Sequence, residues 1–254
     1  MSSGDIKVRD IVFPLILAEQ VKPGESKMVS FLGTGFLVGS DGYALTASHV
    51  VDLKVEPNQA IVGLFVDKAT NKWQMFNADR ADTHPTEDVT LLKMRGWAPF
   101  QTDVRVSFEM QFASFEYQLF GYPNANLYEN VDARDASGAV LGRPDLIYSK
   151  GHIRRRASFS LPGIKGKQLY ELSQPVGAGC SGSPVFQSIN GMWEVAAIYI
   201  ADKIETIAFE TLDKNLDKKI EFIEIAGSMS YAVRMDALKD WVPANCGKTL
   251  DKLT

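Results

Sequence analysis

Three residues of this chain carry side chains that could together cleave an acyl bond: His49, Asp88 and Ser181, in that order along the sequence. Ser181 lies between two glycines in the segment 179–184, which reads Gly-Cys-Ser-Gly-Ser-Pro. A serine hydroxyl is a weak nucleophile near neutral pH and needs an adjacent base that a third group orients. We therefore predict that Ser181 is the nucleophile, that His49 is the base, and that Asp88 orients the imidazole.

The sequence around His49 is the most specific part of the pattern. Residues 33–38 read Gly-Thr-Gly-Phe-Leu-Val and residues 43–51 read Tyr-Ala-Leu-Thr-Ala-Ser-His-Val-Val, while 120–123 and 230–233 are weaker landmarks. Chymotrypsin-type proteases use the same order of His, Asp and Ser. From residue 11 to residue 242 the chain resembles the trypsin-like serine protease superfamily, and within it the HtrA-type bacterial branch without disulfides. The resemblance implies an all-β fold of two six-stranded antiparallel β-barrels of chymotrypsin type, and a serine endopeptidase that works through an acyl-enzyme intermediate.

The resemblance also assigns an oxyanion hole and a specificity pocket. The backbone N–H groups of Gly179 and Ser181 would form the hole, since a glycine there lets the backbone turn without a Cβ clash. Pro175 stands where trypsin has the carboxylate that selects basic side chains, so we expect a small or medium apolar side chain before the cleaved bond. The expected pocket residues are Pro175, Val176, Ile198, Tyr199 and Ile200.

Three other side chains could compete for a catalytic role. Cys180 could supply a thiolate, but the Gly-Ser-Pro that follows the serine selects Ser181 as the nucleophile. Cys180 also occupies the place where trypsin has an Asp that pairs with a new N-terminus, so we expect no activation by N-terminal cleavage. We expect His84 to be a solvated loop residue, and His152 either to line the specificity pocket or to be an ordinary strand residue.

Two functions other than proteolysis are alternatives to this prediction. A catalytically silent module could use the double barrel to bind peptides, although it would have no need of His49, Asp88 and Ser181 together. An acyl hydrolase of another kind would carry its serine on an α/β sheet, in the order Ser, Asp, His. The chain has neither of these features.

Short segments rich in Val, Ile, Phe and Tyr, separated by Gly, Asn, Asp and Pro, predict β-strands throughout the chain. We expect an N-terminal barrel in residues 1–112, a C-terminal barrel in 113–254, and a C-terminal helix near 236–243. The expected strands are 11–18, 31–38, 43–47, 60–66, 73–80, 89–94, 115–121, 149–159, 167–173, 184–188, 193–201 and 230–235.

Residues 202–227 are an insertion relative to the compact family pattern. The segment 213–224 has Asp213, Asn215, Asp217 and Glu224 at the ligand positions of an EF-hand calcium loop, but Lys218 replaces the glycine of its sharp turn. The flanking residues 204–212 and 220–225 are equally suited to the two arms of a β-hairpin. We favour the hairpin over the calcium site.

The composition is that of an ordinary globular protein, with 45% hydrophobic and 23% charged residues. A net charge of −4 without a long basic run gives no support to a nucleic-acid partner. Two cysteines cannot form a disulfide framework. The apolar stretch 11–18 is too short to span a membrane, and it lacks the charge pattern and the small-residue cleavage site of a signal peptide. We expect a cytoplasmic protein with a polypeptide substrate and no cofactor or bound metal. A regulatory domain or partner protein is left open.

Overall fold

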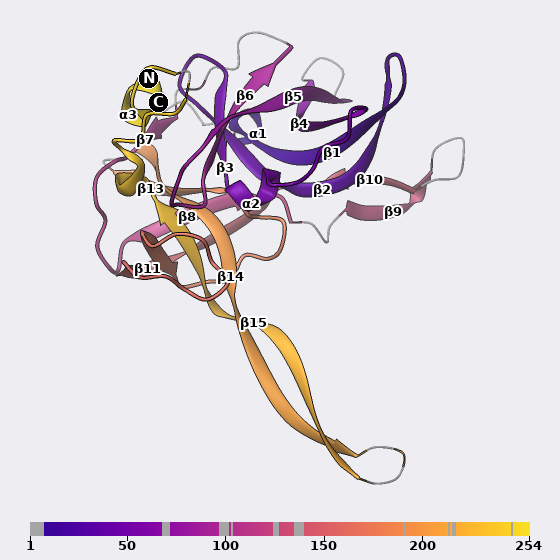
Figure 1. The fold of residues 1–254 in the computed structure, drawn as a ribbon, viewed down its shortest axis with the longest axis vertical. Helices are drawn as coiled ribbons and strands as arrows, with labels where there is room; N and C mark the ends of the chain where they lie inside the picture. The colour runs from indigo at the N-terminus through magenta and orange to yellow at the C-terminus, as the bar shows by residue number, and fades with distance from the viewer. Residues whose placement is uncertain are drawn as a thin grey trace.

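A computed structural model describes the chain over residues 8–67, 72–96, 102, 104–123, 127–134, 140–189, 192–212, 214, 217–244 and 246–254. Figure 1 shows two β-rich bodies stacked on each other and a long two-stranded ribbon that projects from one of them. Within these ranges, no helix is long and apolar enough to cross a membrane.

The first body is a closed barrel with the strand order β1-β2-β3-β6-β5-β4. All six strands confirm segments that the sequence predicts, although β1 and β2 extend beyond the predicted ends. The interior is filled by the Phe13 ring, which lies so near Gly35 and Gly63 that a Cβ at either position would be within 3 Å of it. The strands are β1 (Val12–Lys22), β2 (Glu25–Val38), β3 (Tyr43–Thr46), β4 (Gln59–Asp67), β5 (Lys72–Thr83) and β6 (Thr90–Arg95), with short helices α1 (Val8–Ile11) and α2 (Ser48–Val51).

The second body is a sheet that closes into a second ring of six strands, because β13 pairs with both β8 and β14. A further short strand, β7, pairs in parallel with β14 outside the ring. The expected domain boundary near residue 112 falls in the connection between β6 and β8. The strands are β7 (Arg105–Val106), β8 (Glu116–Gly121), β11 (Ile147–Ala157), β12 (Leu169–Leu172), β13 (Pro184–Ile189), β14 (Met192–Leu212) and β15 (Lys218–Arg234).

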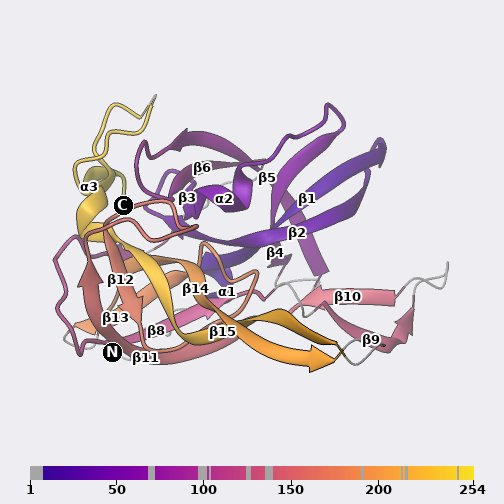
Figure 2. The same ribbon diagram turned by 60° about the horizontal axis from the view of Figure 1, so that its bottom comes forward.

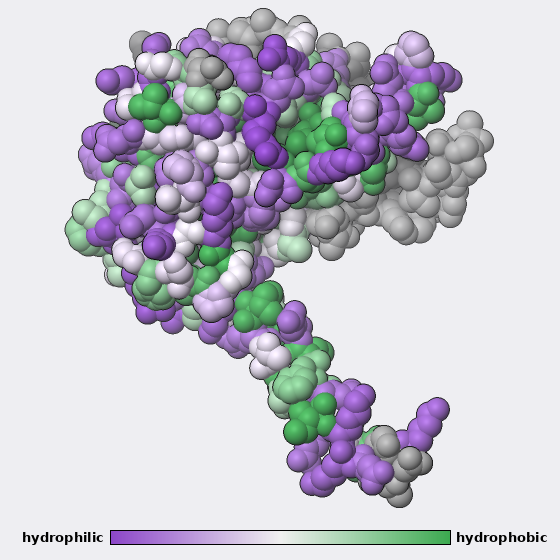
Figure 3. Space-filling model, viewed as in Figure 1, coloured by the Kyte–Doolittle hydropathy of each residue, from purple (hydrophilic) through white to green (hydrophobic). Residues whose placement is uncertain are grey.

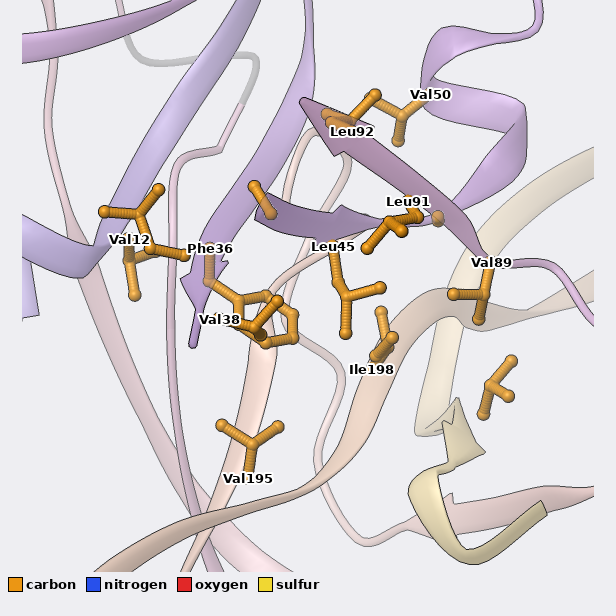
Figure 4. Close-up of a cluster of buried hydrophobic side chains, with 14 of the residues drawn as sticks. Val12, Phe36, Val38, Leu45, Val50, Val89, Leu91, Leu92, Val195 and Ile198 are labelled. Carbon is orange, nitrogen blue, oxygen red and sulfur yellow. The ribbon is translucent and has the colours of Figure 1, made fainter. Parts of the chain in front are cut away.

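The two barrels share one hydrophobic core. Leu45, Val89 and Leu91 of the first barrel are fully buried in the same cluster as Val195 and Ile198 of the second, and Figure 4 shows these side chains meeting between the barrels. Burial of such side chains contributes about 1.5–3 kcal/mol each. The position of one barrel against the other is therefore set by close packing.

The insertion at residues 202–227 is a hairpin, which confirms the favoured alternative. β14 and β15 pair as far as Leu212 and Lys218, and together they form the ribbon that leaves the second barrel in Figures 1 and 2. Glu224, the last ligand of the calcium alternative, lies opposite Thr206 well inside the paired strands. Asp213 and Asn215 lie outside the described residues.

Three elements differ from the sequence-based expectation. The short C-terminal helix expected near 236–243 is a 3-10 helix that spans only Met235–Leu238, and Pro243 disfavours a helical conformation at the residue before it. A short helix α3 (Leu250–Leu253) and a separate hairpin of β9 (Leu127–Arg134) and β10 (Val140–Pro144) were not predicted. Figure 2 shows the β9–β10 hairpin at the side of the second barrel.

Candidate active site

His49 and Asp88 form a hydrogen-bonded pair on the first barrel. His49 lies in helix α2, directly after β3, and Asp88 lies two residues before β6. His49 Nδ1 is 2.6 Å from Asp88 Oδ2, and the His49 backbone N–H donates to Asp88 Oδ1 at 3.0 Å. The Asp88 side chain is 6% exposed and that of His49 is 50% exposed. The carboxylate is thus shielded from water while the imidazole faces solvent, as a base that serves a substrate must.

Ser181 comes to the same region because its turn packs directly on β2. The Thr34 N–H donates to the Ser181 carbonyl at 2.9 Å, and the Gly182 N–H donates to Tyr199 at 2.8 Å. Gly182 has a φ of +90°, and a Cβ there would lie 2.0 Å from the Thr34 carbonyl oxygen. Only glycine fits this contact between the two barrels.

Gly33 lies between the serine turn and helix α2, close to both. A Cβ at Gly33 would lie 2.8 Å from the Val50 side chain and 2.9 Å from the Ser181 carbonyl oxygen. Val50, which follows His49, and the backbone of Ser181 therefore both pack against Gly33. The structure brings His49, Asp88 and Ser181 into one region from three separate segments of the chain.

The Ser181 hydroxyl donates to the Ile200 carbonyl at 2.9 Å. Ile200 is skipped in the pairing of β14 with β15, where a bulge falls between Tyr199 and Ala201. A bulge leaves a residue out of the ladder and increases the local twist. No hydrogen bond joins Ser181 to His49 within the described part of the chain, and such bonds are often long before substrate binds.

Gly179, predicted to contribute to an oxyanion hole, has a left-handed backbone conformation. Its φ is +92°, in the region that favours glycine. Its carbonyl accepts a hydrogen bond from the Thr34 hydroxyl at 3.3 Å, which turns the carbonyl toward the first barrel. Among the hydrogen bonds of the described residues, none uses the N–H of Gly179 or of Ser181. Both donors are thus free for a substrate oxygen.

Asp202 holds the loop that leads to this turn, a role that sequence analysis missed. Its carboxylate accepts the N–H groups of Val176 and Gly177, both at 2.8 Å, and the Tyr199 hydroxyl at 2.6 Å. The Gly177 carbonyl in turn accepts the Cys180 N–H at 3.3 Å. The charge of Asp202 and burial raise the pKa of the Tyr199 phenol, with burial the larger cause. The phenol therefore remains a donor to the carboxylate.

A pocket of about 410 Å³ opens beside the imidazole of His49. The second barrel contributes Ile200, Ala201 and the loop Gly163–Lys165 to its wall. Sequence analysis did not find this loop, which has no strand-like pattern. The Glu87 carboxylate fixes it by accepting the N–H groups of Lys167 and Gln168 at 3.0 and 3.2 Å.

The residues expected to form the specificity pocket do not lie together: they are found in three different parts of the structure. Ile200 lines the pocket beside His49, and Pro175 and Val176 lie in the loop that Asp202 holds. The side chains of Ile198 and Tyr199 are buried in the two cores. Of this pair, Tyr199 reaches the loop through its bond to Asp202, and Ile198 packs between the barrels.

The three competing side chains have other environments. Cys180 is fully buried, and burial together with the charge of Asp202 raises its thiol pKa to about 12. His84 is half-buried rather than solvated: its Nδ1 accepts the N–H groups of Thr86 and Glu87, and its ring lies edge-on to Trp241. Burial lowers the pKa of His84. His152 is exposed on β11.

The described residues contain no group of His, Cys, Asp or Glu side chains able to hold a metal ion. Both cysteines are free thiols.

Several solved structures are similar to this chain. An HtrA-type protease, AlgW with serine 227 replaced by alanine and bound to a decapeptide, has a TM-score of 0.55 at 12% identity, covering 91% of this chain and 61% of that one. The Rv3671c protease of M. tuberculosis, in an inactive form, has a TM-score of 0.53 at 16% identity and covers 90% and 86%. The MamO protease domain of Magnetospirillum magneticum has a TM-score of 0.51 at 14% identity and covers 91% and 94%.

These identities are low enough that the likeness shows a shared fold alone, and the chain spans about three fifths of the length of AlgW. No curated protein matches the sequence. The sequence itself matches the trypsin-like peptidase domain over residues 33–198, which include His49, Asp88 and Ser181. This chain is a member of the trypsin-like peptidase family.

Proposed function

We propose that the protein is a serine endopeptidase with His49, Asp88 and Ser181 as its catalytic triad. The observation that carries the proposal is the Asp88–His49 pair, 2.6 Å apart, beside a serine turn that is seated on the same barrel. A half-exposed imidazole bonded to a buried carboxylate is the arrangement that activates a serine hydroxyl.

The proposed reaction begins when Ser181 Oγ releases its bond to Ile200 and attacks the carbonyl carbon of the scissile peptide. His49 Nε2 accepts the hydroxyl proton and then donates it to the leaving amine. Asp88 keeps the other ring nitrogen protonated and stabilises the imidazolium. Water then attacks the acyl-enzyme, with His49 again as the base, and frees the second product.

The N–H groups of Gly179 and Ser181 would stabilise the oxyanion in both steps. Each such donor is worth about two to three orders of magnitude in rate. The Thr34 hydroxyl supports the position of this turn, since it donates a hydrogen bond to the Gly179 carbonyl.

A polypeptide is the proposed substrate, with a small or medium apolar side chain before the cleaved bond. The pocket beside His49 supports binding of further residues, since Ile164, Ile200 and Ala201 give it an apolar wall. AlgW was crystallised with a decapeptide, which agrees with a polypeptide ligand on this fold. We further propose a cytoplasmic location, which two free thiols support.

One observation favours a second candidate, a silent peptide-binding module. The Ser181 hydroxyl is bonded to Ile200 and not to the imidazole. In this alternative the serine is structural and the groove only holds peptides.

Labelling with a fluorophosphonate separates the two candidates, because the reagent reacts only with an activated serine. We expect one label per chain, located on Ser181 by peptide mass spectrometry, and none in Ser181→Ala. Ser188→Ala, which removes an exposed hydroxyl from β13, is the matched control and should label normally. An unlabelled wild-type protein that still binds peptides would establish the silent module.

A further inference from the structure

The ribbon formed by Ile204–Leu212 of β14 and Lys218–Ala226 of β15, here called the arm, exposes many large apolar side chains. Eight of them are between 39% and 70% exposed: Ile204, Ile207, Phe209, Leu212, Ile220, Phe222, Ile223 and Ile225. Figure 3 shows hydrophobic side chains on the part of the arm nearer the barrel, interspersed with hydrophilic ones. Soluble monomers seldom expose so large an apolar surface, and where they do it marks an interaction site.

Both faces of the arm carry apolar side chains. Ile207 is paired with Ile223, and the next pair along the ladder joins Ala208 to Phe222. Successive pairs of an antiparallel ladder lie on opposite faces. An isolated two-stranded ribbon is marginally stable in water, so a third strand would stabilise the arm as well as cover it.

Two ion pairs lie within the arm. Lys218 lies 3.0 Å from Glu210, and Lys219 lies 3.0 Å from Glu221. Glu205 is paired with Lys203 at the base of the arm. Since most of these charges are already paired, we expect the occupant to be recognised by apolar side chains and by backbone hydrogen bonds.

The free edge of the arm continues directly from the candidate active site. The outer edge of β14 pairs with β13 as far as Ile198, and the backbone of Tyr199 is bonded to Gly182 and Ser183 of the serine turn. Beyond Tyr199 the described strands leave this edge unpaired. The next residue is Ile200, whose carbonyl accepts the Ser181 hydroxyl. A polypeptide whose scissile carbonyl lies at Ser181 can therefore continue along the same edge into the arm.

We propose that the arm is an exosite that adds an extended apolar segment of the substrate as a third strand on the free edge of β14. This inference rests on the proposed endopeptidase function. Antiparallel pairing is the more stable kind, and a chain antiparallel to β14 places its N-terminal part on the arm. The exosite is therefore specific for residues that precede the cleaved bond. The edge from Ile204 to Leu212 is about 30 Å long, taking roughly 3.3 Å per residue.

Chromogenic peptides test the exosite. One is a tetrapeptide that ends before the arm, and the others carry ten further residues, either alternating Val and Thr or alternating Gly and Ser, at the N-terminal end. Several cross-strand pairs together are worth about tenfold in affinity. We expect the Val/Thr extension to lower KM by about that factor relative to the Gly/Ser extension, with kcat unchanged. The same extension on the C-terminal side of the cleaved bond should give no gain.

Two variant proteins test whether the lower KM of the Val/Thr extension depends on the arm. Ile207→Thr with Phe222→Thr and Ile223→Thr removes apolar surface from both faces of the arm and should abolish the gain, while tetrapeptide cleavage persists. The matched control is Val21→Thr with Met28→Thr and Val29→Thr, which removes equally exposed side chains from the β1–β2 hairpin and should keep the gain. N-methylation of alternate residues in the Val/Thr extension, which needs no variant protein, should also abolish it by removing backbone donors.

Three outcomes would overturn the exosite, and a fourth would overturn the protease alone. A gain that survives the arm substitutions, or equal gains from extensions on either side of the bond, would overturn the exosite. So would a wild-type oligomer in sedimentation that the arm variant converts to monomers, because the arm would then be a subunit contact. Fluorescence anisotropy of a labelled Val/Thr peptide with Ser181→Ala measures the exosite without catalysis. Binding there without any hydrolysis by the wild type would refute the protease and leave the exosite standing.

Discussion

The carboxylate of Asp202 accepts the backbone N–H of Gly177 at 2.8 Å, two residues before the glycine of the proposed oxyanion hole. Asp202 lies on β14, so this bond ties the strand beside the serine to the loop that shapes the hole. Trypsin positions the same turn with an Asp next to its serine, where this chain has Cys180. Asp202 thus gives the turn an anchor that requires no cleavage of the chain.

Asp202→Asn should lower both the rate of fluorophosphonate labelling and kcat/KM by about one to two orders of magnitude. In either orientation of the amide, one of the N–H groups of Val176 and Gly177 would face an NH₂ group and lose its acceptor. Misplacement of a catalytic group by about 1 Å costs rates of this size. Tyr199→Phe is the control, because it keeps both backbone bonds and should have the smaller effect. Labelling of Asp202→Asn at the wild-type rate would contradict the role assigned to this residue.

Asp88→Asn should lower kcat by about four orders of magnitude. The Asn oxygen would keep the bond from the His49 N–H, which leaves its NH₂ group facing Nδ1. That contact forces the ring proton onto Nε2, and the imidazole can no longer accept a proton from Ser181. Steady-state kinetics at saturating peptide measure the loss, with Asp79→Asn, an exposed residue on β5, as control. A loss below tenfold would refute the triad.

The buried thiol of Cys180 should be inert. With its pKa raised to about 12, it stays protonated at pH 8 and should not react with iodoacetamide, so the reagent should leave activity intact. Cys246, which is partly exposed, provides the internal comparison and should react first. Cys180→Ala should retain the hydrolysis rate. Alkylation of Cys180 that parallels inactivation would instead point to a thiolate enzyme.

His84 should make the fold less stable in acid. Burial lowers its folded-state pKa below the ordinary value of 6.5, so the unfolded chain binds the proton more readily. The contribution is therefore fully present above pH 6.5 and is lost as the pH falls through the folded-state value. Urea unfolding at pH 7.5 and 5.5 measures the loss. His84→Asn, whose oxygen can still accept the N–H groups of the turn, should lose less stability over that interval, and equal losses would show that His84 does not contribute.

Peptide libraries should show cleavage after Val, Ala or Leu in preference to Arg or Lys. Pro175 provides no charge in the expected pocket, and the Asp202 carboxylate already accepts three hydrogen bonds. Faster cleavage after basic residues would be evidence that Asp202 faces the substrate. In that case Asp202→Asn should abolish the basic preference selectively.

The sequence predicts the parts of the site that depend on local pattern. His49, Asp88 and Ser181 each lie in a short segment whose residues are specific in themselves, and the first barrel's strands are marked by runs of β-branched and aromatic residues ending at turns such as Asp41-Gly42. The contacts of Asp202 and Glu87 could not be predicted in this way. Each carboxylate binds backbone groups of a distant segment, and no local spacing records that pairing.

The bulge at Ile200 is a second feature that the sequence does not predict. Ile200 leaves the β14–β15 ladder, and its carbonyl is thereby available to Ser181. Alternation of apolar and polar residues does not reveal such a slip. The helix expected near 236–243 is shorter than its pattern predicts. The spacing of Leu238, Trp241 and Val242 is helical, yet the 3-10 helix ends at Leu238 and Trp241 packs against His84 from an irregular segment.

The glycine contacts between strand β2 and the serine turn have a consequence for biosynthesis. The Ser181 carbonyl lies against Gly33, and Gly182 lies against the Thr34 carbonyl, with no side chain between the two segments. Because a chain is translated from its N-terminus, the strands of the first barrel, which end at Arg95, are made before the serine turn that packs on them. The proposed triad is therefore complete only after the second barrel has been translated and has closed against the first.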